Sequence, residues 1–193
     1  MKKLVFKTKI NCPYPIVDNE IRNNLVDPAT GKWDYEKALL SVVGVWNKNK
    51  ITQISLRKGN EEKFKDKLKK LLDGFNELHA FNRLMENGNF KGYLNKEYCI
   101  KEIKLVKGKG ITKEFLFNLL LKNAIPKEEI ELTDLNDPLE GNHHKMMEFY
   151  EKNRFNEIEK ANRICLTKEF FIKKYSEWLL KNMNLDKNNW IIK

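Results

Sequence analysis

The chain has 193 residues, of which 41% are hydrophobic and 33% are charged. These proportions exclude a disordered chain and predict a globular protein with a core of its own. The formal net charge of +10 favours a polyanionic partner such as nucleic acid, because Lys and Arg side chains release counterions when they contact phosphates.

Cysteine usage and apolar runs narrow the class of protein further. Cys12, Cys99 and Cys165 form no Cys-x-x-Cys pair and leave one thiol over, which argues against a disulfide framework or a zinc finger and predicts a cytoplasmic location. The longest apolar runs fall short of the ~20 residues that a bilayer span needs, so we expect no membrane partner. We expect one domain over 1–193, mainly sheet with helices in 1–110 and mainly helical in 111–193.

Strands dominate the predicted structure of the first sixty residues. The pattern KLVFKTKI predicts a strand over 3–10 that ends at Pro13 and Pro15, followed by a long polar connection over 11–37. Two β-rich runs then predict antiparallel strands, which a tight polar corner at Lys48 and Asn49 joins into a hairpin.

Helices alternate with strands in the rest of the chain. The clearest helix has Phe64, Leu68 and Leu72 at helical spacing, and Thr112 stands where a later helix needs its N-terminal cap. The order of these elements predicts an α/β fold, a mixed sheet with helices packed on it. In chain order we expect a helix over 60–76, a parallel strand over 77–82, a helix over 83–94 interrupted by Gly88, a strand over 97–108, a helix over 111–124 and two helices within 142–180.

Three short motifs in the same order resemble those of the DEDD superfamily of predicted 3′-5′ exonucleases, which have the ribonuclease H-like fold. The first strand of that family carries an aspartate and a glutamate two residues apart, in a frame that here reads LVFKTKI with Lys7 and Lys9. Its second motif is a strand that ends in asparagine with an acid four residues later, here Asn82 and Glu86. Its third motif resembles NRICLT, in which Cys165 stands where the family has an acid.

The resemblance implies a ribonuclease H-like mixed sheet with a helical C-terminal part, and a degenerate metal site. Members of the family hold two Mg²⁺ or Mn²⁺ ions with four carboxylates. Here Lys7, Lys9 and Cys165 occupy three of the acid positions and Glu86 alone keeps its acid, so the resemblance implies no bound ion. We therefore expect a catalytically inactive nucleic-acid-binding or accessory protein, a pseudonuclease, whose contacts to DNA or RNA include Lys7, Lys9, Asn82 and Arg163.

A second interpretation places the first acid pair further along the chain. In PIVDNEIRN, Asp18 and Glu20 form an Asp-x-Glu pair, and with Glu86 they would supply three ligands of an active Mg²⁺- or Mn²⁺-dependent 3′-5′ exonuclease. The fourth ligand would then come from Asp134, Asp137 or His144.

Three further alternatives stay open at this level. A protein-interaction subunit would keep the fold and use a protein partner, with its charge reflecting genome composition. Lys7 and Lys9 are also compatible with an ordinary solvated strand face. Asn82 is placed either to cap the next helix or to contact substrate.

Overall fold

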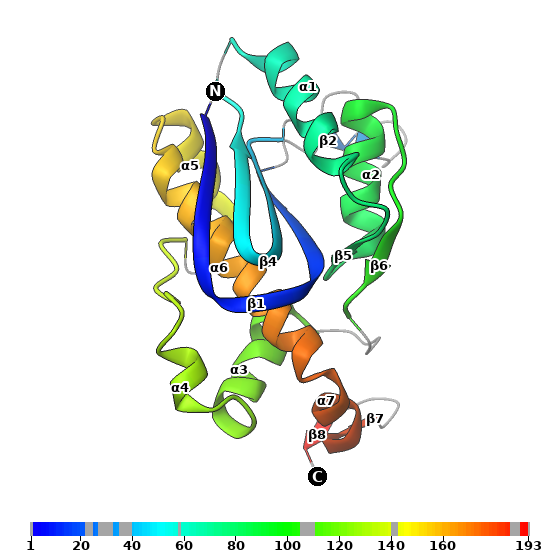
Figure 1. The fold of residues 1–193 in the computed structure, drawn as a ribbon, viewed down its shortest axis with the longest axis vertical. Coiled ribbons are helices and arrows are strands. Elements are labelled where there is room, and N and C mark those ends of the chain that lie inside the picture. Colours follow the sequence, from blue (N-terminus) through cyan, green and yellow to red (C-terminus); the bar gives the residue numbers. More distant parts are fainter. Residues whose placement is uncertain are drawn as a thin grey trace.

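The computed structural model describes residues 2–21, 25–26, 33–34, 40–57, 59–104, 111–139, 143–185 and 190–192. It is an α/β fold in which helices pack on a curled, mixed sheet of strand order β4-β1-β5-β6 (Figure 1). The sheet consists of β1 (Lys2–Glu20), β4 (Val42–Ser55), β5 (Leu78–Ala80) and β6 (Ile100–Glu102). Two small sheets pair β2 (Leu25–Val26) with β3 (Trp33–Asp34) and β7 (Met183–Leu185) with β8 (Trp190–Ile192). The helices are α1 (Glu61–Leu72), α2 (Arg83–Leu94), α3 (Lys113–Asn123), α4 (Lys127–Ile130), α5 (His143–Glu151), α6 (Phe155–Lys174) and α7 (Ser176–Asn182).

β1 is one strand of 19 residues, about twice as long as the strand predicted over 3–10. Pro13 and Pro15 do not end it, which corrects that prediction. Its register with β4 shifts between Lys7 and Cys12 and again between Cys12 and Ile16, the interval that holds both prolines. Proline is tolerated at such an irregularity because its missing N–H costs no ladder hydrogen bond there. Residues 16–20 therefore extend the first strand instead of belonging to a polar connection.

The two halves of β1 have different neighbours. Ile16 pairs with His79 of the parallel strand β5, and residues 16–20 also pair with β4. Within the described part of the chain, residues 2–7 pair with β4 alone. Consequently the C-terminal half of β1 lies at the centre of the sheet, and its N-terminal half lies at an edge.

β4 bends back on itself as the predicted hairpin does, and Figure 1 shows it as a U-shaped ribbon. The bend lies at Lys48, whose φ of 55° is in the left-handed region, and the backbone N–H of Leu56 donates to the carbonyl of Ser41 at 2.5 Å across the base. The hairpin with its corner at Lys48 and Asn49 is thus confirmed.

The helical predictions agree with the structure except in two details. α1, α2 and α3 lie within the predicted ranges, and the Thr112 hydroxyl caps α3 by accepting from the backbone N–H of Phe115 at 3.1 Å. However, α2 runs through Gly88 without the predicted interruption. The tail forms α5, α6 and α7 where two helices were expected. No helix in the described part of the chain is long and apolar enough to cross a bilayer.

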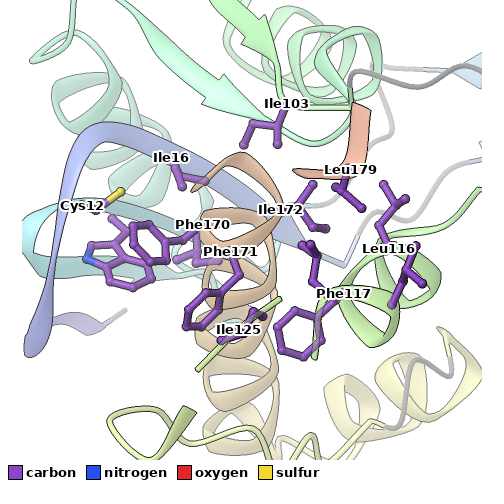
Figure 2. Close-up of a cluster of buried hydrophobic side chains, with 14 of the residues drawn as sticks. Cys12, Ile16, Ile103, Leu116, Phe117, Ile125, Phe170, Phe171, Ile172 and Leu179 are labelled. Carbon is purple, nitrogen blue, oxygen red and sulfur yellow. The ribbon is translucent and has the colours of Figure 1, made fainter. Parts of the chain in front are cut away.

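Helices cover the sheet on both faces. On one face, Figure 2 shows Phe170 and Phe171 of α6 between Cys12 of β1 and Phe117 of α3, in a core cluster to which Ile16 also belongs. On the other face, α1 and α2 bury their apolar stripes against the next residue of β1, Val17. Because side chains alternate along a strand, even-numbered residues near Ile16 point toward α6 and odd-numbered ones point toward α1 and α2.

A glycine lets α6 approach the hairpin closely. Gly44 lies opposite Asp18 in the register of β1 and β4. A Cβ atom at Gly44 would lie 2.2 Å from Oδ1 of Asn162 and 2.8 Å from Cδ1 of Leu166, both on α6. These distances are far below van der Waals contact, so the packing of α6 on the hairpin depends on the missing side chain.

We expect Gly44→Ala to lower the free energy of unfolding by about 1–3 kcal/mol, because the methyl group overpacks this contact. Urea denaturation followed by circular dichroism measures the loss. Gly74→Ala is the matched control, since the nearest atom to its added Cβ is the carbonyl oxygen of Leu71 at 3.3 Å. Equal losses in the two variants would show that α6 does not need Gly44.

Candidate functional site

A cavity of about 220 Å³ lies where β1, α2, α3 and α6 meet, and carboxyl groups dominate its polar lining. We call it the acid cavity. Among the described residues that line it, Lys113 contributes the only cationic side chain. The acids are Asp18, Glu20, Glu86, Glu114, Asp137 and Glu169.

The central part of β1 supplies the first two acids. Asp18 and Glu20 lie two residues apart and therefore point to the same face, the face toward α6. Their exposed fractions are only 4% and 9%, although carboxylates are rarely buried without compensation. Placing this pair in the middle of the sheet thus requires a counter-charge nearby.

One stripe of α6 faces this pair. Asn162, Cys165 and Glu169 are spaced by three and four residues, which brings them to one side of the helix. The thiol of Cys165 and one carboxylate oxygen each from Asp18 and Glu20 all lie within 4.8 Å of one another. Strand and helix together therefore gather three potential ligand atoms at one point.

Lys113 supplies the counter-charge from the first turn of α3. Its Nζ lies 2.9 Å from Oδ1 of Asp18 and 2.6 Å from Oε1 of Glu169. The other oxygen of Glu169 accepts from the backbone N–H of Phe81 at 3.1 Å. A single ammonium group thus links the strand acid to the helix acid.

A chain of buried amides fixes the orientation of Asp18. Nδ2 of Asn162 donates to Oδ2 of Asp18 at 2.9 Å and to its carbonyl oxygen at 3.0 Å. Oδ1 of Asn162 accepts from Nε2 of Gln53 at 2.7 Å, and Nη1 of Arg163 donates to Oε1 of Gln53 at 2.9 Å. Because Asn162 and Gln53 are both fully buried, this network locks the carboxylate in one rotamer.

The charges in the cavity are not balanced, and the pKa values reflect this. Burial, together with the charge of Asp18, raises the pKa of Glu20 to about 8. Burial also raises the pKa of Glu169 to about 8, against the opposing effect of Lys113. Burial disfavours the charged form of Lys113, but the surrounding acids, Asp18 first, outweigh it and hold the pKa of Lys113 well above its ordinary value. Burial and the neighbouring Glu20 raise the pKa of Cys165 well above its ordinary range.

Several of the predicted site residues meet in this cavity. Asp18, Glu20, Glu86 and Cys165 line it together, and the second interpretation of the sequence named the first three as ligands. The ligand atoms that lie within 4.8 Å of one another belong to Asp18, Glu20 and Cys165. Asn82 lines it as well, and its side chain caps α2 by accepting from the backbone N–H of Met85 at 3.3 Å. The capping alternative for Asn82 is therefore confirmed.

Lys7, Lys9 and Arg163 lie elsewhere, in the lining of a second cavity of about 310 Å³ beside the N-terminal half of β1. The expectation that Lys7 and Lys9 share a site with Glu86 is thereby corrected, because the edge half of β1 carries the lysines and the central half carries the acids. Arg163 points away from the acid cavity, with its guanidinium 4.1 Å from the ring centroid of Phe6.

The residues predicted as a fourth metal ligand do not all lie in the acid cavity. Asp137 lines the acid cavity and lies 3.4 Å from Nζ of Lys168. Asp134 belongs to the second cavity and pairs with Lys160 at 3.0 Å. The side chain of His144 lies outside the described residues.

Sequence reasoning missed Lys113 and Glu169. The sequence spacing could have identified Glu169 as a site residue, because it follows Cys165 by four residues on the same predicted helix face. Lys113 had none, since only the packing of α3 against α6 brings its side chain to β1.

No protein-family model, curated protein or solved structure matches this chain. The lining residues of the acid cavity therefore have to indicate which ligands it suits. Six carboxyl groups line the cavity, Lys113 pairs with two of them and Lys168 with two others, and this excess of acids favours the binding of further positive charge. Oxygen-rich sites of this kind suit Mg²⁺, Mn²⁺ or Ca²⁺.

We expect Lys113→Gln to lower the free energy of unfolding by about 3–5 kcal/mol, because it leaves two buried acids without their cation. Lys101→Gln is the matched control, since Lys101 pairs with Glu77 on the surface with 62% of its side chain exposed, where such a pair contributes less than about 1 kcal/mol. Chemical denaturation in EDTA measures both. A Lys113 loss no larger than the control loss would mean that the acids need no fixed cation.

The raised pKa values predict how stability depends on pH in metal-free buffer. Glu20 and Glu169 have folded pKa values of about 8 against an ordinary value of 4.5, so the folded state binds more protons between these limits. Their contribution to stability is therefore complete below pH 4.5 and is lost as the pH rises toward 8.

Glu20→Gln removes one of the two carboxyl groups that bind a proton more tightly in the folded state than in the unfolded state. Its stability relative to the wild type should be higher at pH 8 than at pH 4.5. Glu62→Gln, at a side chain that is 88% exposed, should show no such difference. Denaturation curves at the two pH values test this, and parallel behaviour of the two variants would contradict it.

Proposed function

We propose that the acid cavity binds Mg²⁺ or Mn²⁺ and that the protein is a metal-dependent nuclease, a 3′-5′ exonuclease on DNA or RNA. The observation that carries this proposal is the meeting of Asp18, Glu20 and Glu86 in one cavity. Those are the acids that the sequence resemblance requires once the first motif is placed at the centre of β1.

The topology gives the proposal further support. The hairpin β4 pairs antiparallel with β1, while β5 and β6 follow in parallel on the other side. A ribonuclease H-like sheet is the finer assignment that we propose for this order. On this assignment the acids of β1 come from the strand at its centre.

The donor set fits a hard divalent cation, with one exception. Asp18 and Glu20 offer anionic oxygens, which Mg²⁺ and Mn²⁺ prefer. The thiol of Cys165 suits softer metals, and its raised pKa keeps it protonated. Glu169, one turn further along α6, offers the carboxylate that Cys165 lacks. A cation bound there would polarise a phosphoryl oxygen and activate a water molecule.

The chain's own residues have defined parts in this proposal. Asn162 holds Asp18 in the orientation for ligation, as amide and hydrogen-bond partners behind metal ligands do. Asp18 would hold a metal ion only without its ion pair to Lys113, whose ammonium would then be available to a phosphate.

A second candidate function is nucleic-acid binding without cleavage. Two observations favour it: the ammonium of Lys113 already lies between Asp18 and Glu169, and Cys165 replaces an acid of the family motif. In this case Lys113 stands permanently where a metal ion would lie, and the protein retains nucleic acid in the absence of any metal.

Digestion of end-labelled oligonucleotides distinguishes the two functions. We expect Mn²⁺- or Mg²⁺-dependent shortening from the 3′ end, abolished by EDTA and reduced by about 100-fold or more in Asp18→Asn, because loss of a metal ligand removes the electrostatic stabilisation of the transition state.

Asp66→Asn is the matched control, because it makes the same chemical change on the exposed side of α1 and should leave the rate unchanged. Retention of the oligonucleotide with no digestion at any metal concentration would overturn the nuclease and select the second candidate. Digestion that persists in Asp18→Asn would place the active site elsewhere or in a contaminant.

A further inference from the structure

A groove of about 510 Å³ lies on the opposite face of the sheet from the acid cavity, between the hairpin and α1. α1 lies beside β4, as Figure 1 shows, and the floor of the groove includes Val45 and Ile54 from the core cluster that α1 covers. No carboxyl group of a described residue lines this groove. Four lysines do, and we call it the lysine groove; they are Lys3, Lys50, Lys67 and Lys70.

The lysines of the groove are not neutralised by ion pairs within the described part of the chain. Some other exposed lysines are paired: Lys91 with Glu97, Lys101 with Glu77, and Lys152 with Glu148. The positive potential of the groove is therefore not neutralised locally, although 27 acidic residues are present in the chain.

The strand register sets a further lysine, Lys7, opposite one of these four, although Lys7 lines the second cavity and not the groove. Lys50 lies directly opposite Lys7 in the antiparallel pair of β1 and β4, so both side chains project from the same face. Like charges directly opposite each other destabilise a sheet. A bound anion would relieve that repulsion, which gives the arrangement a reason beyond solubility.

The other polar members of the groove match a sugar-phosphate chain. Asn47 and Thr52 offer an amide and a hydroxyl, the neutral side chains that accompany lysine in contacts to phosphate and sugar. Phe75, which follows α1 and is partly exposed, offers a ring on which an unpaired base can stack. An acidic peptide would use the lysines and the two polar side chains as well, so the ring of Phe75 is the feature that favours a nucleic-acid strand.

We propose that the lysine groove binds the phosphodiester backbone of a single nucleic-acid strand. Binding in the lysine groove would give the protein a site for nucleic acid that is separate from the acid cavity. The inference rests on the proposed function only for the conclusion that the bound strand is also the substrate. The groove and the acid cavity lie on opposite faces of β1 and β4, so a strand in the groove must pass around an edge of the sheet to reach the acids.

Fluorescence anisotropy of a labelled oligothymidylate, in EDTA and over a series of salt concentrations, tests the groove without any cleavage. The variant K3Q/K50Q/K67Q/K70Q should bind at least about tenfold more weakly than the wild type. Its plot of log affinity against log salt should lose a slope of roughly 0.7 for each phosphate contact removed.

The control variant K91Q/K101Q/K152Q/K174Q loses the same number of charges from lysines that are each paired with a carboxylate. It should keep the wild-type slope. Thermal unfolding of both variants is the control that checks whether they are folded.

Equal weakening in the two variants would overturn the proposal, because net charge alone would then explain binding. Competition by polyglutamate as effective as that by unlabelled oligothymidylate would also overturn it, in favour of an acidic protein partner. Groove-dependent binding without any nuclease activity would support the groove while the proposed function fails, so the two failures are distinguishable.

Discussion

The ion pairs of Lys113 with Asp18 and Glu169 are the interaction on which this site depends. Asp18 and Glu20 stand at the centre of a sheet, where carboxylates pay a large desolvation cost. One ammonium from α3 compensates part of that charge and joins α3 to both β1 and α6. Burial is the main reason that the pKa values of Glu20 and Glu169 rise to about 8, and the charge of Lys113 opposes the rise without cancelling it. The excess of buried acids over cations is the ground on which we propose that the cavity binds a metal ion.

The curled sheet separates two opposite kinds of surface chemistry. Its α6 face holds the acid cavity, and its α1 face holds the lysine groove. β1 contributes to both because it is long and changes its register with β4 midway. The edge half carries lysines and the central half carries the acids. The apolar cluster around Phe170 and Phe171 holds α6 against the central half and thereby fixes the geometry of the cavity.

The local elements were predictable from the sequence, whereas the site was predictable only in part. The helix around Phe64 and Leu68, the cap at Thr112 and the hairpin corner at Lys48 follow from spacing and turn chemistry within a few residues. Pro13 and Pro15 misled the strand prediction, because a register shift that tolerates them depends on the partner strand. Asp18, Glu20 and Glu86 were found as an alternative, but the role of Lys113 required knowledge of how α3 packs. Long-range contacts of this kind leave no mark in the local pattern.

Anomalous X-ray diffraction from crystals grown with Mn²⁺ is the most direct test of the central claim. We expect a single strong peak between the carboxylates of Asp18 and Glu20, with the ammonium of Lys113 displaced from its position 2.9 Å from Asp18. An ordered Lys113 still bridging Asp18 and Glu169, with no peak in the acid cavity at saturating Mn²⁺, would contradict it.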